Sequence, residues 1–186
     1  MKIVCLGWGS LIWRPESLLI QRQWFQDGPF LPIEFVRQSR DGRLTLVINE
    51  TSKAVRTLWA LMDTDDLEKA KTSLQIREGI KKENVTKHIG VLKVADNFDN
   101  DMVNNIKEWA EKIKVDAVIW TSLEPKFNDV DKRVPTIDEA VDYLRSKLTI
   151  QERQSAEEYI RRAPIQIDTV FRQTFEREFN WTPIKI

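Results

Sequence analysis

The chain has very few of the residues that metal sites, disulfides and nucleophilic triads require. Its 186 residues include one cysteine, Cys5, and one histidine, His88. A single thiol cannot form an internal disulfide, and the two residues cannot complete a four-ligand zinc site without carboxylates. His88 lies in an expected strand with no Ser, Cys or acid in a readable triad pattern, so we expect a structural or surface role for it. The sequence therefore predicts neither an internal disulfide nor a zinc site built from Cys and His alone.

The sequence also lacks an excess of charge of either sign and any long apolar run. The 29 basic residues balance the 29 acidic ones, so no net field favours nucleic acid or an anionic membrane as a partner. No stretch approaches the roughly 20 apolar residues of a membrane helix, and the apolar run before Gly7 is too short for a signal peptide. We expect a cytoplasmic protein that binds neither nucleic acid nor membrane. The sequence does not predict its oligomeric state.

The length and the order of the patterns predict one mixed domain. A domain usually has about 100 to 200 residues, and seven tryptophans with eight phenylalanines supply large side chains for a core. The first two-thirds is rich in β-prone runs with helical patterns between them, and the pattern is helical from Thr136 onward. We predict a single α+β (mixed α/β) domain over residues 1–186, with residues 136–186 as a helical extension packed on it.

Local patterns predict the individual elements. Strands are expected at residues 3–6, 54–62, 85–94 and 115–120, and a hairpin at residues 33–38 and 43–48 around Asp41-Gly42. Helices are expected to begin at residues 15–17, to run over residues 67–78 and 102–113, and to include residues 137–143, 156–160 and 167–179 in the tail. The pairs Asp65-Asp66 and Asp129/Asp131 lack full cation-ligand spacing, so a helix cap and a loop are the better interpretations.

The first candidate site is the loop after the first strand, with the sequence Gly7-Trp8-Gly9-Ser10-Leu11-Ile12-Trp13. Two glycines let the backbone bend sharply and approach a ligand, and loop amides that face one way can bind an anion or oxyanion. A dinucleotide fingerprint is disfavoured, because Ile12 stands where the third glycine belongs and Pro15 where the helix should run. A purely structural turn remains open.

The second candidate is Glu78, directly before Gly79. If the helix ends at Gly79, Glu78 lies beside the negative end of the helix dipole, which disfavours the carboxylate and raises its pKa toward the operating pH. A general acid/base needs that tuning. Arg77 is expected to point elsewhere on the helix and not to cancel the effect. Spacing alone does not separate this interpretation from a solvated glutamate at a helix end.

Together, the two candidates resemble the gamma-glutamylcyclotransferase superfamily, which includes the ChaC-like branch. Its members open with a strand and a Y-G-S-L loop, often F-G-Y-G-S-L-I-W followed by a proline. Residues 5–15 of this chain read C-L-G-W-G-S-L-I-W-R-P, with Trp8 in place of the tyrosine, and Ile76-Arg77-Glu78 matches the V-R-E-like segment of the catalytic glutamate. The similarity covers residues 1–95, where residues 37–47 and 57–61 also resemble family strands. The tail at residues 150–181 does not align.

The resemblance implies a small barrel-like mixed sheet with surrounding helices. It also implies an enzyme that releases 5-oxoproline from a small gamma-glutamyl peptide or amine by intramolecular cyclisation. Glu78 would be the catalytic acid/base, the substrate-binding residues would be Gly7, Trp8, Gly9, Ser10 and Leu11, and no metal or cofactor would be needed. The indole of Trp8 implies an altered pocket and a substrate other than glutathione. The alternative is an inactive member of the family that binds a small metabolite or a protein.

Overall fold

The computed structural model describes residues 1–184, which fall into two compact units. The first unit is built from Met1–Gly7, Arg14–Leu31 and Arg56–Leu123. The second is built from Trp8–Trp13, Pro32–Val55 and the chain from Glu124 onward. Each unit thus combines three separate segments of the chain, and each is described by itself. The expectation of a single domain stays a prediction.

The first unit contains a four-stranded mixed sheet with the strand order β5-β1-β7-β6. β1 pairs parallel with β7 and antiparallel with β5, and β6 pairs antiparallel with β7. The elements of this unit are β1 (Ile3–Gly7), β5 (Leu58–Leu61), α1 (Leu67–Glu78), the 3-10 turn η1 (Lys82–Asn84), α2 (Val85–His88), β6 (Ile89–Lys93), α3 (Asp101–Lys112) and β7 (Ala117–Thr121). All five residues of β1 are buried, as a central strand covered on both faces requires.

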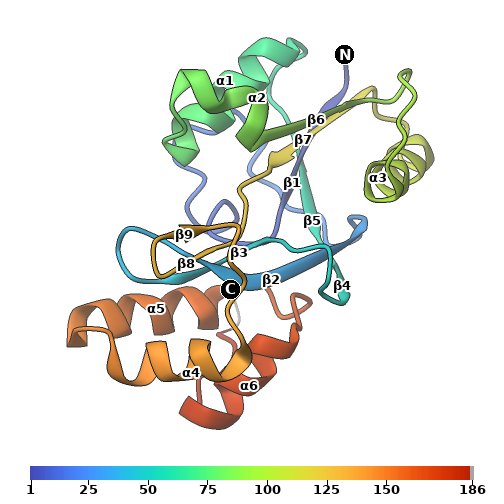
Figure 1. The fold of residues 1–186 in the computed structure, drawn as a ribbon. Helices are drawn as coiled ribbons and strands as arrows, with labels where there is room; N and C mark the ends of the chain where they lie inside the picture. Colours follow the sequence, from blue (N-terminus) through green and yellow to red (C-terminus); the bar gives the residue numbers. More distant parts are fainter. Residues whose placement is uncertain (185–186) are drawn as a thin grey trace. The chain divides into compact units, whose positions relative to one another are not determined.

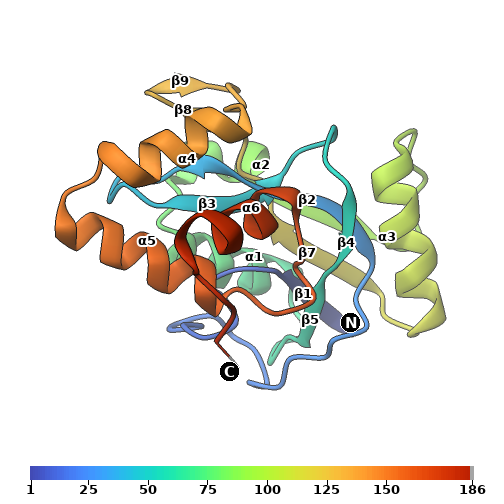
Figure 2. The ribbon, with the colours of Figure 1, turned by 90° about the horizontal axis from the view of Figure 1, so that it is seen from below.

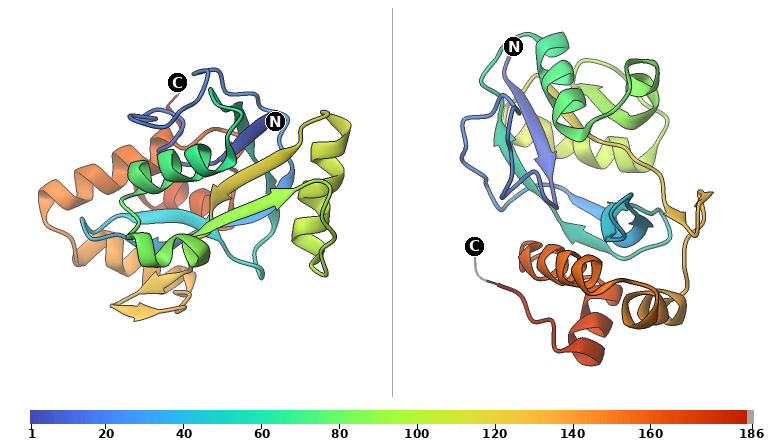
Figure 3. Two further views of the ribbon diagram at one scale, coloured as in Figure 1. Left: turned by 90° about the horizontal axis from the view of Figure 1, so that it is seen from above. Right: turned by 90° about the vertical axis from the view of Figure 1, so that its left-hand side faces the viewer.

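The register of β1 shows which helix covers which face of this sheet. Leu6 pairs with Trp59, whose ring lies edge-on to that of Trp109 in α3 with the ring centres 5.8 Å apart. Cys5 and its partners point to the opposite face, because successive side chains of a strand alternate. α1 packs on β7 and β6 from the Cys5 side, so α1 and α3 lie on opposite sides of the sheet (Figures 1 and 3).

The second unit contains a five-stranded mixed sheet, in which the predicted hairpin is confirmed. β2 and β3 pair antiparallel, and Gly42 between them has a positive φ of 80°, which glycine adopts without strain. The strand order is β3-β2-β8-β9, with β4 also paired to β2. The strands are β2 (Phe30–Gln38), β3 (Leu44–Ile48), β4 (Ala54–Arg56), β8 (Lys126–Phe127) and β9 (Val130–Asp131).

Three helices follow in this unit and lie together on one side of β2 and β3 (Figures 1 and 2). They are α4 (Ile137–Ser146), α5 (Ile150–Arg162) and α6 (Val170–Phe179). Thr136 and Thr149 begin the first two as capping boxes, each with a glutamate three residues later, and Thr169 caps the third. The helical character predicted from Thr136 onward is therefore confirmed for the described residues.

The α+β class is confirmed, but the sheet arrangement differs from the barrel-like one expected. The described residues form two mixed sheets and no closed barrel. The predicted strand at residues 54–62 is in fact two strands in different sheets, because the chain turns at Thr57, whose amide and hydroxyl both donate to the carbonyl of Pro29. One apolar run therefore contributes to both units, which periodicity alone could not predict.

Three local predictions were wrong or incomplete. No helix begins at residues 15–17: the amide of Leu18 bonds to the carbonyl of Pro15 and closes one turn. Residues 85–88, expected in a strand, form the short helix α2, which ends at His88. Asp131, expected in a loop, belongs to β9, and its partner β8 was not predicted; each of these strands has only two residues, too few for a pattern to appear.

Arg172 of α6 joins two helices of the second unit. Its side chain is 1% exposed, and its guanidinium donates to the carbonyls of Ala163, Pro164 and Ile167 at 2.6 to 3.2 Å. These carbonyls lie just after the end of α5, where no helical amide is available to pair with them. Arg172 also approaches Glu176 at 3.4 Å, so its buried charge is balanced.

We predict that Arg172→Met lowers the free energy of unfolding by about 2 to 4 kcal/mol, because the buried carbonyls of Ala163 and Ile167 lose the guanidinium as donor and that of Pro164 keeps only the amide of Ile167. Denaturant unfolding followed by circular dichroism measures the loss. Arg177→Met is the matched control, since Arg177 lies on the same helix with 68% of its side chain exposed, and it should change stability by less than about 0.5 kcal/mol. Equal effects of the two substitutions would contradict the role given to Arg172.

Candidate functional site

Glu78 is the last residue of α1, as predicted. Asp66 caps the start of the helix by accepting bonds from the amides of Glu68 and Lys69, which confirms the cap interpretation. At the other end Gly79 adopts the left-handed conformation, with φ of 62°, and its amide bonds to the carbonyls of Gln75 and Ile76. A glycine that ends a helix in this way holds the preceding residue in the final turn. The local sequence thus fixes the position of Glu78.

The carboxyl group of Glu78 is largely withdrawn from water, with 16% of the side chain exposed. Burial raises its pKa above the ordinary value, the charge of Arg77 opposes that rise, and the charge of Glu16 adds to it. The predicted direction of the pKa shift therefore agrees with the structure. Its main cause is burial rather than the helix dipole that the sequence suggested.

Arg77 does not point away from Glu78, and this prediction was wrong. Its Nη1 donates to Oε1 of Glu78 at 2.9 Å, and its Nε donates to the backbone carbonyl of Arg14 at 3.0 Å. Consecutive helical residues normally face different directions. In the last turn, however, the long guanidinium side chain reaches back to its neighbour. The result is a carboxylate held by one cation that is itself held by the backbone.

Cys5 of β1 lies on the sheet face that Glu78 shares. Its side chain is fully buried, and burial, followed by the charge of Glu78, raises the pKa of the thiol. The expectation of a buried cysteine in the first strand is confirmed, and its high pKa keeps the thiol protonated and unreactive. α1, which carries Glu78, packs against β7, the parallel neighbour of β1. Gly7, two residues after Cys5, belongs to the same face.

The candidate loop is divided between the two units. Gly7 ends β1 in the first unit, and Trp8 to Trp13 belong to the second. The indole of Trp8 is buried, and its N–H donates to the carbonyl of Leu46 in β3 at 3.2 Å. Leu11 is buried, whereas Ser10 is partly exposed. The side chains of Trp8 and Leu11 therefore contribute to packing.

The backbone of this loop keeps its capacity to bind a ligand. A turn is closed by the amide of Ile12, which donates to the carbonyl of Gly9 at 3.1 Å. The amides of Gly9 and Leu11 make no hydrogen bond within the part of the chain that the structure describes. Gly9 is buried, and a buried amide without a partner is uncommon enough to need an explanation.

Gly9 is required by its contact with Tyr159 of α5. A Cβ at this position would lie 2.5 Å from the tyrosine hydroxyl and 3.5 Å from the ring carbon that carries it. The hydroxyl is fixed in place, because it accepts a bond from the amide of Leu46 at 3.3 Å. The ring of Trp13 also lies edge-on to that of Tyr159, with the centres 5.5 Å apart. The glycine therefore lets the loop approach β3 and α5 closely.

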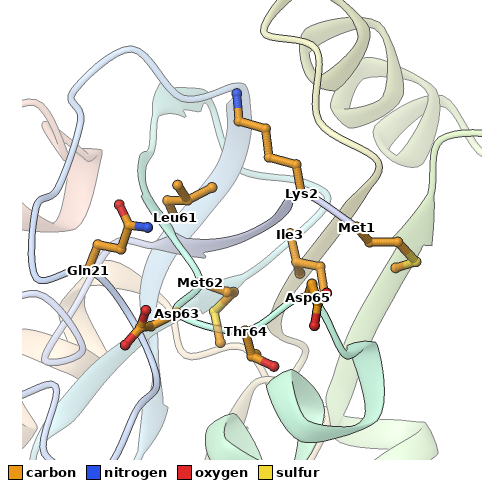
Figure 4. Close-up of a pocket in the computed structure, with 9 residues that line it drawn as sticks. All are labelled: Met1, Lys2, Ile3, Gln21, Leu61, Met62, Asp63, Thr64 and Asp65. Atoms are coloured by element: carbon orange, nitrogen blue, oxygen red, sulfur yellow. The ribbon is translucent and has the colours of Figure 1, made fainter.

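Two hollows in the first unit lie away from Glu78. One, of about 460 Å³, is at the amino end of β1 and is lined by Met1, Lys2, Ile3, Gln21, Leu61, Met62, Asp63, Thr64 and Asp65 (Figure 4). The other, of about 420 Å³, runs along α1 and is lined by Ser17, Leu19, Glu68, Lys69, Thr72, Ser73 and Ile76. Glu78 lines neither, so neither is assigned to the candidate site.

No group of three or more His, Cys, Asp or Glu side chains within residues 1–184 could hold a metal ion. None of the helices in that range has the length and apolar character needed to cross a membrane.

Comparisons with protein-family models, with curated proteins and with solved structures found no match. The family resemblance therefore depends on the motifs at residues 5–15 and 76–78.

We predict that Gly9→Ala destabilises the protein mainly through the hydroxyl of Tyr159. Tyr159→Phe removes that hydroxyl and leaves a ring carbon 3.5 Å from the new methyl group, an ordinary contact. In a double-mutant cycle, Gly9→Ala should therefore cost about 1 to 3 kcal/mol in the wild-type background and clearly less in the Tyr159→Phe background. Thermal or denaturant unfolding of the four proteins measures this coupling. Strictly additive losses would show that the hydroxyl does not constrain the loop.

We predict that Glu78→Gln stabilises the protein progressively as pH rises. The pKa of Glu78 is raised in the folded state, so protonation of Glu78 contributes to the stability of the wild type. This contribution is fully present below the unfolded pKa, about 4.3, and is lost as pH rises through the folded pKa. Glutamine does not titrate, so the stability of the variant relative to wild type should increase as pH rises from the unfolded pKa through the folded pKa, and should then level off. Urea unfolding across this range tests it. Glu68→Gln, at an exposed position of the same helix, should follow the wild-type pH dependence.

Proposed function

We propose that this protein is a gamma-glutamylcyclotransferase-type enzyme in which Glu78 is the general acid/base. The observation that carries the proposal is a buried carboxyl group with a raised pKa at the residue that matches the catalytic glutamate of that family. A general acid/base works best when its pKa lies near the operating pH. A solvated glutamate at a helix end, the alternative interpretation, would be exposed.

The proposed reaction needs one carboxylate and a well-held substrate. The α-amine of the gamma-glutamyl group attacks the γ-carbonyl carbon, a new C–N bond closes the five-membered ring, and the bond to the leaving nitrogen breaks. Glu78 takes one proton from the α-ammonium before the attack and gives it to the leaving nitrogen as the old C–N bond breaks. The ring nitrogen loses a second proton on ring closure, which passes to the released amine, so the amine leaves as an ammonium ion and the protons balance. Because the reaction is intramolecular, holding the folded conformer supplies much of the acceleration.

Arg77 suits this cycle because it is fixed. Its ion pair with Glu78 and its bond to the carbonyl of Arg14 hold the carboxyl group in one orientation. The charge of Arg77 also limits the rise of the pKa of Glu78, which favours the carboxylate form that acts as the base. Burial and a single cation together tune the group for both proton transfers.

The substrate-binding role of residues 7–11 belongs to the same proposal. It is supported by the unpartnered amides of Gly9 and Leu11, which suit the substrate carboxylate or the developing oxyanion. It is not supported as a role of the Trp8 side chain, whose only donor is occupied by Leu46. The change from the family tyrosine to Trp8 therefore leaves the ligand without the tyrosine hydroxyl as a hydrogen-bond partner. This loss favours a substrate other than glutathione.

The second candidate function is that of an inactive member that binds a small metabolite or a protein, and the packing of Trp8 supports it. The indole of Trp8 is buried and its N–H is bonded to Leu46, so the loop lacks the tyrosine hydroxyl that the family loop has. This candidate gives Glu78 no chemical role, so the two functions differ in what loss of its carboxylate does.

Incubation with glutathione, gamma-glutamyl amino acids and gamma-glutamyl amines, with 5-oxoproline as the measured product, tests the proposal. We expect release by the wild type and a loss of about 100-fold or more in kcat for Glu78→Gln. Glu68→Gln is the matched control, because Glu68 lies on the same helix with 77% of its side chain exposed, and it should keep wild-type activity.

Two results would contradict the proposed enzyme. Wild-type protein that releases no 5-oxoproline from any of the three substrate classes would favour the binding function. Release that survives Glu78→Gln unchanged would show a cyclotransferase whose acid/base is another residue.

A further inference from the structure

Thr121 carries a polar group that the fold leaves without a partner. Its Oγ1 is buried, and it forms no hydrogen bond among the residues that the structure describes. A buried hydroxyl in that state is costly, whereas a methyl group of the same size would not be. By contrast, the buried hydroxyl of Thr57 in the same unit donates to the carbonyl of Pro29 at 2.7 Å. The hydroxyl of Thr121 thus contributes nothing to the fold that valine could not.

The register of the sheet places Thr121 on the face that carries Glu78. Cys5 of β1 pairs in parallel with Ile119 of β7, so these two side chains share a face. Thr121 comes two residues after Ile119 and returns to that face. The charge of Glu78 acts on Cys5, and α1, which carries Glu78, packs against β7. The unpartnered hydroxyl and the buried carboxylate therefore belong to the same side of the same sheet.

Thr121 also lies at the end of the sheet where a ligand is expected. β1 and β7 are the parallel pair, and they end at Gly7 and Thr121 respectively. In open sheets with parallel strands, ligands bind outside the carboxyl ends of those strands. Gly7 adds no side chain there, since glycine has none. The hydroxyl of Thr121 is therefore the side-chain polar group at the point where both parallel strands end.

We propose that the hydroxyl of Thr121 binds the α-carboxylate of the gamma-glutamyl group in the Glu78 site. This inference rests on the proposed function, because it takes the substrate from there. Glu78 must approach the α-ammonium, and the α-carboxylate is attached to the same carbon atom. A negative group so close to Glu78 needs a hydrogen-bond donor, and a threonine hydroxyl can donate one.

Kinetics of Thr121→Val and Thr121→Ser test the contact. Valine keeps the shape and removes the donor, so we expect KM for gamma-glutamyl substrates to rise about 10-fold or more, because a bond to a charged group is lost. Serine keeps the donor and should stay within about threefold of wild type. The melting temperature of Thr121→Val should be unchanged or higher, because an unsatisfied polar atom is removed.

Thr57→Val is the matched control. It removes a hydroxyl that does bond within the protein, so it should lower the melting temperature and leave KM unchanged. A purely structural role for Thr121 would give the same pattern as Thr57. The opposite patterns expected for the two valine variants therefore separate substrate binding from folding.

Failure of this inference is distinguishable from failure of the proposed function. An active wild type with unchanged KM and kcat in Thr121→Val would overturn the role of Thr121 and leave the cyclotransferase intact. Calorimetric titration of Glu78→Gln, and of Glu78→Gln combined with Thr121→Val, with a gamma-glutamyl amine measures the contact without turnover. Equal affinity of the two, or no binding by either, would also overturn the inference.

Discussion

Burial of β1 on both faces is the constraint on which the first unit depends. A strand between two neighbours satisfies its backbone groups within the sheet, but its side chains require cover above and below. α3 supplies the cover on the side of Leu6 through Trp109, and α1 supplies it on the side of Cys5. α1 packs on β7 and β6, the neighbours of β1 on one side, and burial of its last residue raises the pKa of Glu78.

The capping residues and the apolar periodicities were predictable, because both act locally. Asp66 and Gly79 define α1 from sequence alone, and the position of Glu78 follows from them. The hairpin around Gly42 is equally local. What could not be predicted is which surface each element meets. Residues 54–62 show this best, since a continuous β-prone run is shared between two sheets by a turn at Thr57.

The site shows the same division between local and distant information. The motif at residues 7–11 and the glutamate at position 78 could be identified as candidates from the sequence, but the surroundings of each could not. Three features of the site depend on side-chain rotamers or on contacts between residues distant in the chain. Arg77 folds back on Glu78, Trp8 donates to the carbonyl of Leu46, and Gly9 contacts Tyr159. Thr121 has no sequence signal, because only the sheet register shows which face it occupies.

The parallel pairing of β1 with β7 has a consequence for synthesis of the chain. β1 is synthesised before both of its partner strands, and Leu58–Leu61 can satisfy one of its edges once that segment has been translated. The other edge stays open until Ala117–Thr121 has been translated, since Ile3 pairs with Ala117. An apolar strand with a free edge is a template for mispairing. The long separation of β1 from β7 in the chain therefore prolongs the interval in which β1 can pair with the wrong strand.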